Sequence, residues 1–243
     1  MRIDLYLFEN GLAESRTDAK RMITEGLVSV SGVPITKPSY DFSGSVEDIA
    51  IEAPVRSYVG RGGLKLEHAL QHFRISVKDR SCLDVGASSG GFTDCLLQNG
   101  ALRVIAVDSG RDQLSKKLIG DGRITSIEGF NARYMSPADL PYVPEVCVMD
   151  VSFISATYII PSVSRCLADN GDFILLIKPQ FEVGRENVGK GGIVKSEAAR
   201  DAAVKKVVDF AIGFGLSLSG LTTSPIKGGD GNIEFLAHFV KRG

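Results

Sequence analysis

The stretch CLDVGASSGGFTD, residues 82–94, constrains the fold of this chain more than any other feature. It joins a short apolar segment containing an acid to a turn rich in glycine and serine. Glycine lacks the Cβ atom that would keep a ligand away from the backbone, so such turns occur beside bound molecules, where a strand leads into a helix. The stretch therefore predicts a strand, a ligand-binding turn and a helix of an α/β fold.

The chain beyond residue 60 alternates between short apolar runs and helical patterns. A helix is expected near 64–74, because Leu66, Ala69, Leu70 and Phe73 recur on one face. Strands separated by helical segments are typical of a mainly parallel sheet that is covered on both faces. The last two strands are expected to form an antiparallel pair at the sheet edge. The expected strands lie near 81–85, 103–107, 124–127, 145–149, 173–177, 216–225 and 232–240.

The first 55 residues have a different pattern, which predicts a small separate α/β domain. Ser15 is expected to cap a helix together with Asp18, and Gly26 is expected to end that helix. The segment LVSVSGVPI, residues 27–35, alternates apolar and polar residues about a Ser-Gly turn and predicts a hairpin.

The two parts are expected to be joined by a linker. The stretch APVRSYVGRGG, residues 53–63, lacks apolar periodicity, and 243 residues are enough for one large and one small domain. We therefore expect an N-terminal domain over 1–55, a linker over 56–59 and a second domain over 60–243.

Composition excludes several classes of protein. No apolar run approaches the roughly 20 residues that span a bilayer, and the first residues, MRIDLYLFENG, carry charges where a signal peptide would be apolar. The four cysteines lie in apolar surroundings, which indicates reduced core residues of a cytoplasmic protein. The formal net charge is −1, so a nucleic-acid partner would require local clusters of cations. His68 and His72 have a zinc-compatible spacing, but no further Cys or His cluster completes a site, and we expect no metal.

The acid before the glycine turn favours a cationic ligand. A nicotinamide dinucleotide is the first alternative, but its fingerprint requires the spacing G-x-G-x-x-G, which Gly86 and Ser88 do not provide. Asp84 would repel a pyrophosphate and attract a ligand that carries an amino group and a sulfonium. S-adenosylmethionine is such a ligand, and we expect it as the cofactor.

Further polar residues follow the next two strands. Asp108 ends the second strand and is expected to accept both ribose hydroxyls of the cofactor; the alternative is a carboxylate that only caps the next turn. Glu128 and Asn131 follow the third strand, where the adenine edge is expected. The expected cofactor-binding residues are Asp84, Gly86, Ala87, Ser88, Ser89, Gly90, Phe92, Asp108, Glu128 and Asn131.

Residues 2–39 resemble the S4 RNA-binding module, which also occurs in pseudouridine synthases and tyrosyl-tRNA synthetases. The matching pattern is RID..L...GLAESR..A...I..GLVSVSG....KPS. The resemblance implies that Arg16, Lys20, Arg21 and Lys37 bind RNA. The alternative is a solvated basic face on an ordinary small domain.

The chain as a whole resembles the TlyA family, on the segments LDVGASSGGFTD, NAR, MDVSFIS, LIKPQFE, GKGGIV and SPIKGGDGNIEFL. The resemblance implies an S-adenosylmethionine-dependent ribosomal RNA 2′-O-methyltransferase with a seven-stranded, mainly parallel Rossmann-like sheet of the FtsJ type. It implies ribosomal RNA or a ribosomal subunit as partner, no membrane and no stable protein partner. The chain is similar to the shorter family type, so a cytidine ribose of large-subunit RNA is the expected target, with small-subunit RNA as an additional target left open.

Methyl transfer to a ribose hydroxyl needs a group that takes the hydroxyl proton, because a neutral alcohol is a poor nucleophile. The TlyA and FtsJ families share a Lys-Asp-Lys-Glu tetrad, which Lys65, Asp150, Lys178 and Glu234 match in type, order and flanking sequence. The resemblance implies that Lys178 activates the hydroxyl, that Asp150 holds it near the methyl group, and that the other two orient and balance charge. Taken singly, three of these residues have specific alternatives. Lys65 could be a solvated helix residue, Asp150 could cap a loop and Glu234 could form a surface ion pair.

The glycine-rich segment 180–195 is expected to be a mobile loop that closes over RNA with Arg185 and Lys190, rather than a plain exposed connection. Tyr58 stands where the family's linker often has tryptophan, which alters any stacking there. Two functions of other classes remain open. One is an RNA-binding or ribosome-assembly factor without catalysis, and the other is a pore-forming hemolysin, a label that family members often carry.

Overall fold

The computed structural model describes residues 1–13, 15–24, 26–51 and 58–243. The chain divides into two compact units, Met1–Ser57 and Tyr58–Gly243, here called the N-terminal and C-terminal units. Residues 56 and 57 of the expected linker lie outside the described residues. The last linker residue is tied to the C-terminal unit, where the Val59 amide donates a 2.8 Å hydrogen bond to Asp94 Oδ2.

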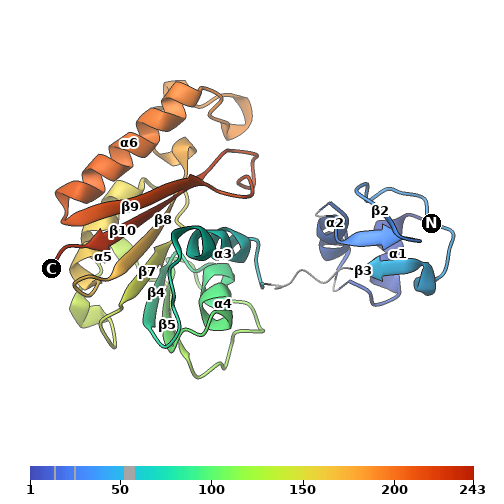
Figure 1. The fold of residues 1–243 in the computed structure, drawn as a ribbon, viewed down its shortest axis with the longest axis horizontal. Helices are drawn as coiled ribbons and strands as arrows, with labels where there is room; N and C mark the ends of the chain where they lie inside the picture. The colour runs from blue at the N-terminus through green and yellow to red at the C-terminus, as the bar shows by residue number, and fades with distance from the viewer. Residues whose placement is uncertain (14, 25, 52–57) are drawn as a thin grey trace. The chain divides into compact units, whose positions relative to one another are not determined.

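The N-terminal unit packs two helices against a three-stranded antiparallel sheet of order β2-β1-β3 (Figure 1). Its core contains Ile3, Leu7, Ala19, Ile23 and Val28, all fully buried. The elements are α1 (Ile3–Glu9), α2 (Arg16–Thr24), β1 (Val28–Val30), β2 (Val33–Pro34) and β3 (Ile49–Ile51).

The predicted helix cap and hairpin of this unit are confirmed. Ser15 Oγ accepts a 3.1 Å hydrogen bond from the Asp18 amide at the start of α2. The turn between β1 and β2 is made by Ser31 and Gly32, with φ of 47° and 81°. The sequence pattern does not predict β3, because three residues beside acidic neighbours carry little periodicity; pairing with β1 determines that strand.

The C-terminal unit is built on a seven-stranded sheet of order β6-β5-β4-β7-β8-β10-β9. The first five of these strands are parallel, and β9 and β10 form the predicted antiparallel pair at the sheet edge. Strand β10 also runs antiparallel to β8, which the sequence pattern did not predict. The strands are β4 (Ser81–Val85), β5 (Arg103–Val107), β6 (Ile124–Ile127), β7 (Val146–Met149), β8 (Asp172–Ile177), β9 (Leu216–Thr223) and β10 (Phe235–Lys241). The helices are α3 (Gly62–Phe73), α4 (Gly91–Gln98), α5 (Ile160–Cys166) and α6 (Glu197–Gly213).

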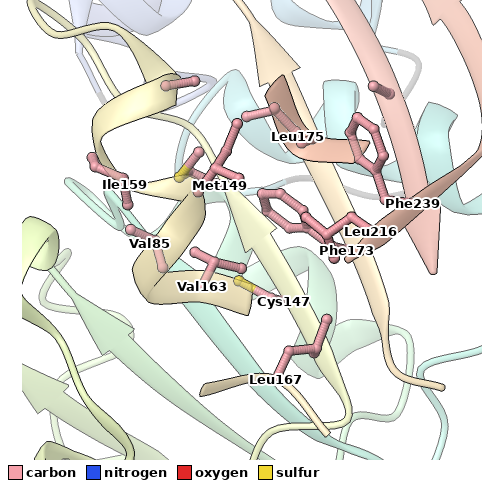
Figure 2. Close-up of a cluster of buried hydrophobic side chains, with 14 of the residues drawn as sticks. Val85, Cys147, Met149, Ile159, Val163, Leu167, Phe173, Leu175, Leu216 and Phe239 are labelled. Atoms are coloured by element: carbon pink, nitrogen blue, oxygen red, sulfur yellow. The ribbon is translucent and has the colours of Figure 1, made fainter. Parts of the chain in front are cut away.

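Helices cover both faces of this sheet (Figure 1). Alternate strand residues enter two separate cores, because side chains of a strand point to opposite faces in turn. On one face, Val85, Cys147, Met149, Phe173 and Phe239 pack with α5 and α6 (Figure 2). On the other face, the intervening strand residues pack with α3 and α4. This two-sided burial is the Rossmann-like arrangement expected from the alternating pattern.

The strand register brings the ends of separate strands to one edge of the sheet. Val85, at the end of β4, pairs with the last residues of β5 and β7. The residues that follow β4, β5, β7 and β8 are Gly86, Asp108, Asp150 and Lys178. Because β10 is antiparallel to β8, its first residue lies at this same edge. This carboxyl edge is where an α/β sheet of this kind binds ligands.

Candidate active site

The glycine turn after β4 is built on positive backbone angles. Gly86 and Gly90 have φ of 85° and 91°, a region that side chains other than glycine rarely adopt, and Ser88 between them has φ of 47°. A Cβ atom at Gly86 would lie 2.3 Å from the carbonyl oxygen of Asp150. Only glycine therefore lets the ends of β4 and β7 approach this closely.

A cavity of about 370 Å³ opens at the carboxyl edge, above the ends of β4, β5 and β7. Gly86, Ser88, Asp108 and Asn131 give it polar walls, as expected, and Asp150 lies on its border. Its apolar walls come from Val107, Phe130, Ile154 and Ile159.

Asp108 is held rigidly in this cavity. Its Oδ2 accepts a 2.7 Å hydrogen bond from the Ser88 amide, and its Oδ1 accepts one of 2.7 Å from the Gly110 amide. The carboxylate therefore caps the following turn and also faces the cavity, so the two interpretations of this residue are compatible. Each oxygen keeps a second lone pair for a ligand hydroxyl.

A second cavity, of about 220 Å³, adjoins the first and shares Gly86, Ser88, Asp150 and Ser152 with it. Its lining adds the expected turn residues Ala87, Ser89 and Phe92 and the expected catalytic Lys178. Four residues that were not predicted complete it, namely Gly60, Arg61, Gly62 and Gly91. The glycine turn thus lines two adjoining cavities. The partly apolar cavity of about 370 Å³ is here called the outer cavity, and the polar cavity of about 220 Å³ the inner cavity.

Three of the expected cofactor residues, Asp84, Glu128 and Gly90, line neither cavity. Asp84 is fully buried behind the turn, where its Oδ2 accepts a 2.6 Å hydrogen bond from Thr93 Oγ1. Burial raises the pKa of Asp84 to about 7, against the opposing effect of that hydrogen bond. The carboxyl group points to the α4 face of the sheet because it alternates with Leu83 and Val85, which face the other core.

Glu128 also lies away from the cavities. Its Oε2 accepts a 2.8 Å hydrogen bond from the Asp112 amide, and it faces a separate cavity of about 450 Å³ with Leu118 and Ile124. Gly90 caps α4 and packs against Leu118 instead of lining the site.

The first expected catalytic pair forms at the border of the two cavities. Lys178 Nζ lies 2.6 Å from Asp150 Oδ1 and donates a 2.7 Å hydrogen bond to Ser152 Oγ. The two charged side chains keep 11% and 20% of their surface exposed, respectively. The pair is therefore largely removed from water but can still exchange protons with it.

The second expected pair is more deeply buried. Lys65 Nζ, on α3, lies 2.5 Å from Glu234 Oε2, and the two side chains are 10% and 2% exposed. These values exclude a solvated helix residue and a surface ion pair. Glu234 was expected within a strand but lies just before β10, at the carboxyl edge. Gly228 makes room for it, since a Cβ atom there would lie 2.4 Å from Glu234 Oε1.

The start of α3 links the two pairs. A Cβ atom at Gly62, the first residue of α3, would lie 4.0 Å from Asp150 Oδ2 and 3.3 Å from the Phe92 ring. The first turn of α3, which carries Lys65, therefore abuts the carboxylate that holds Lys178. Of the four expected catalytic residues, Asp150 and Lys178 line the inner cavity, whereas Lys65 and Glu234 form their ion pair without lining it.

Sequence reasoning missed Ser152 and Phe153, which follow β7. Phe153 has φ of 63° and is 92% exposed, and its ring lies 5.4 Å from that of Phe181. A bulky residue with positive φ is strained, and strain of this kind gathers at functional sites. The segment MDVSFIS was singled out only for the resemblance, and no local pattern indicates the positive φ.

The comparisons with known proteins match both units. The model of the FtsJ-like methyltransferases matches residues 58–241, and the model of the S4 domain matches residues 1–48. The Mycobacterium tuberculosis protein named 16S/23S rRNA (cytidine-2′-O)-methyltransferase TlyA is 39% identical over 96% of this chain and 87% of its own. The chain belongs to the TlyA family of FtsJ-like methyltransferases.

Two further similar proteins support the assignment to this family. The Bacillus subtilis (strain 168) protein YqxC, which carries the name of an rRNA methyltransferase, is 47% identical over 98% of this chain and 84% of its own. A solved structure of a Streptococcus thermophilus protein named as a hemolysin is 44% identical, with a TM-score of 0.77, and covers 100% of this chain and 88% of its own.

The expected RNA-binding cations of the TlyA-family S4 domain differ in their surroundings. Arg16 lies 3.5 Å from Asp4 Oδ2, whose carboxylate is fully buried, and Arg21 pairs with Asp18 at 2.7 Å. Lys20 and Lys37 are exposed and form no ion pair with any described residue. The two arginines thus have ion-pair partners within the domain but keep 49% and 36% of their side-chain surface exposed, so the expected RNA-binding role of all four cations stays a prediction. 

The expected loop 180–195 contains three short 3₁₀ turns, and Arg185 and Lys190 are exposed on it. Asn232 ties the end of this segment to the loop before β10. Its Nδ2 donates to the Gly192 carbonyl at 2.9 Å, and its Oδ1 accepts from the Val194 amide at 3.0 Å.

Among the described residues, no three His, Cys, Asp or Glu side chains are grouped so that they could hold a metal ion. Over the same described ranges, no helix is both long and apolar enough to cross a membrane. All four cysteines are free and buried.

Proposed function

We propose that this protein transfers a methyl group from S-adenosylmethionine to the 2′-hydroxyl of a cytidine in ribosomal RNA. The observation that carries the proposal is the largely buried Lys178–Asp150 pair, which lines a cavity at the carboxyl edge of a methyltransferase sheet. The buried Lys65–Glu234 pair completes the tetrad at the same edge of the sheet. The names of the relatives support the substrate, because the TlyA proteins that they identify modify cytidine in rRNA.

The residues of the outer cavity fit the cofactor. Asp108 offers carboxylate oxygens for two ribose hydroxyls, and Phe130, Ile154 and Ile159 offer apolar walls for a purine. The polar inner cavity beside Gly86 suits the amino acid part of the molecule. When bound, S-adenosylmethionine supplies an electrophilic methyl group on a sulfonium centre. In this arrangement Asp84 acts from behind the turn and makes no direct contact with the ligand.

Lys178 and Asp150 act on the target hydroxyl. The ammonium and carboxylate lie 2.6 Å apart on the border of both cavities, so a ribose hydroxyl placed there meets both groups. Asp150 holds the hydroxyl through its proton, and Lys178 activates the oxygen and stabilises the negative charge that builds up on it. The Asp150 carboxylate takes up the hydroxyl proton and releases it to solvent through the exposed side of the pair.

Lys65 and Glu234 set the charge around this step. Their ion pair is internally neutral, so it leaves no net buried charge near the first turn of α3, which abuts Asp150. The rigid first turn of α3 then fixes the orientation of Asp150. Positioning of this kind supplies much of the rate in a displacement that requires alignment of the reacting atoms.

RNA is bound by separate parts of the chain. Lys20 and Lys37 of the S4 domain, and Arg185 and Lys190 beyond β8, present exposed cations for phosphates. The exposed ring of Phe153 beside the cavity offers a face on which an unstacked base can lie. The target nucleotide is thereby drawn out of its stack.

The test is methylation of naked and assembled ribosomal RNA of both subunits with tritiated S-adenosylmethionine. We expect incorporation into a cytidine ribose by the wild type and none by Lys178→Ala. RNA binding without any incorporation by the wild type would overturn the proposal in favour of a non-catalytic assembly factor. Lysis of cells by purified protein that persists in Lys178→Ala would favour the hemolysin alternative.

A further inference from the structure

Two loops of the C-terminal unit carry the proposed catalytic groups, residues 150–156 after β7 and 178–182 after β8. The two loops contact each other at three places. Lys178 contacts Asp150 and Ser152, and the rings of Phe181 and Phe153 lie 5.4 Å apart. At the third place, Glu182 of the second loop contacts Ser155 and Ala156 of the first loop.

Glu182 is an acid whose side chain is only 2% exposed. Its Oε2 accepts a 2.6 Å hydrogen bond from Ser155 Oγ, and its Oε1 accepts one of 2.7 Å from the Ala156 amide. Lys206, on α6, lies 3.8 Å from Oε2 and donates a 2.9 Å hydrogen bond to the Glu182 carbonyl. The carboxylate therefore fixes the far end of the turn that begins at Asp150.

A buried acid at this position is costly to the fold. Burial raises the pKa of Glu182, although the hydrogen bonds from Ser155 and Ala156 and the charge of Lys206 oppose the rise. An apolar residue of similar size would avoid that cost. An apolar residue, however, could not accept the hydrogen bonds that the Glu182 carboxylate accepts from Ser155 and Ala156.

The turn between the two fixed ends holds the strained residue of the site. Phe153, with φ of 63°, lies between Ser152, which contacts Lys178, and Ser155, which contacts Glu182. A non-glycine residue keeps a positive φ only where its surroundings overdetermine the backbone. Contacts at both ends of the turn provide that constraint.

We propose that Glu182 is a positioning residue for methyl transfer, which holds the 152–156 turn so that Ser152 stays on Lys178 and the Phe153 ring stays exposed. This proposal rests on the proposed function for its activity readout alone. The geometry of the turn can be measured independently of any reaction.

The activity test compares Glu182→Ala with Glu182→Gln. Glutamine can still accept from the Ala156 amide and donate to Ser155 Oγ, whereas alanine leaves both groups unpaired. We expect Glu182→Ala to lower kcat on the order of 100-fold, as misplacement of reacting groups by about 1 Å does. Glu182→Gln should recover most of that loss. In both variants the loss in kcat should exceed the loss in affinity for S-adenosylmethionine.

Asp172→Asn is the matched control for the loss of a partly buried acid. Asp172 starts β8, accepts hydrogen bonds of 2.6 Å from Arg80 and 2.7 Å from His238, and lies at the opposite end of the strand from Lys178. We expect this variant to lower Tm while kcat, measured well below Tm, stays near the wild-type value. Equal kcat losses in Asp172→Asn and Glu182→Ala would reduce Glu182 to a structural role and overturn the proposal.

A fluorescent reporter tests the turn without activity. The chain contains no tryptophan, so Phe153→Trp places a single indole on the turn. Adding Glu182→Ala to this variant should lower the anisotropy of the indole and make it more accessible to a quencher, whereas adding Glu182→Gln should change either value little. Unchanged anisotropy in the alanine variant would overturn the proposal. If the indole is freed as expected but the wild type methylates no RNA, the proposed function fails while the positioning of the turn by Glu182 stands.

Discussion

Breaking the buried Lys65–Glu234 pair should separate its contribution to stability from its contribution to methyl transfer. Glu234→Met leaves the Lys65 ammonium inside the protein without the carboxylate that lies 2.5 Å away. Lys65→Met leaves the Glu234 carboxylate buried without the ammonium. The double variant removes both charges and leaves two side chains of similar length in contact.

The magnitude follows from the burial of the two groups. Removing one partner of a buried ion pair costs about 3–5 kcal/mol, whereas replacing both by apolar residues is often near neutral. Since 1 kcal/mol shifts Tm by about 2–4 °C in a domain of 150–250 residues, each single variant should melt about 6–20 °C lower. The double variant should recover most of that loss.

The assay combines thermal unfolding, followed by circular dichroism, with methyl transfer to ribosomal RNA at a temperature below every Tm. We expect the double variant to be folded and to bind S-adenosylmethionine, yet to methylate at a small fraction of the wild-type rate. Stability would then be restored without function, because the orientation of Asp150 by the charged pair would still be absent.

Two results would refute this reasoning. Wild-type methylation by the folded double variant would mean that the pair only fills space. Equal destabilisation of the double and single variants would mean that the two charges do not compensate each other, contrary to their distance and burial.

Three further predictions concern other parts of the chain. Gly86→Ala should abolish S-adenosylmethionine binding in calorimetry, because of its φ of 85° and the 2.3 Å approach to the Asp150 carbonyl, whereas Gly213→Ala, with open space around it, should bind normally. Asp84 has its pKa raised from 3.8 to about 7, so its proton is released on unfolding between these values and stability should fall as pH rises through that range; urea unfolding of Asp84→Asn at pH 5 and pH 8 should show a smaller fall than the wild type. Replacing Lys20 and Lys37 together by alanine should reduce the slope of log affinity for RNA against log salt by about 1.4–1.8 without changing Tm, and an unchanged slope would remove these lysines from the RNA interface.

The fold could be predicted because its signals are local. Strands β5, β7 and β8 are mostly apolar runs bounded by polar turns, whereas the edge strands β6 and β9 contain exposed Ser and Thr residues. Burial on both faces follows from the absence of a polar alternation in β4 and β7. Strand β3 was missed because it depends on pairing with β1 rather than on its own sequence.

The site could be predicted in part, for reasons that differ between residues. Gly86 and Asp108 occupy positions defined by strand ends, so their place at the carboxyl edge follows from topology. The orientation of Asp84 could also have been predicted from the sequence, since the residue lies between Leu83 and Val85 and its side chain must face the opposite side of the sheet. By contrast, nothing in the local sequence indicates that Glu128 turns toward the Asp112 amide, or that Arg16 partners a buried acid.

The antiparallel last strand explains how the tetrad is completed. In a wholly parallel sheet, a residue that precedes a strand lies at the amino edge, on the far side from the ligand. Strand β10 pairs with β8 in the opposite direction, with Phe235 facing Ile177, so the residue before it reaches the carboxyl edge beside Lys178. Glu234 can therefore meet Lys65 of α3 there, although 169 residues separate the two in the chain. The reversal of this one strand thus brings the fourth residue of the tetrad to the carboxyl edge, where Asp150 and Lys178 follow the parallel strands β7 and β8.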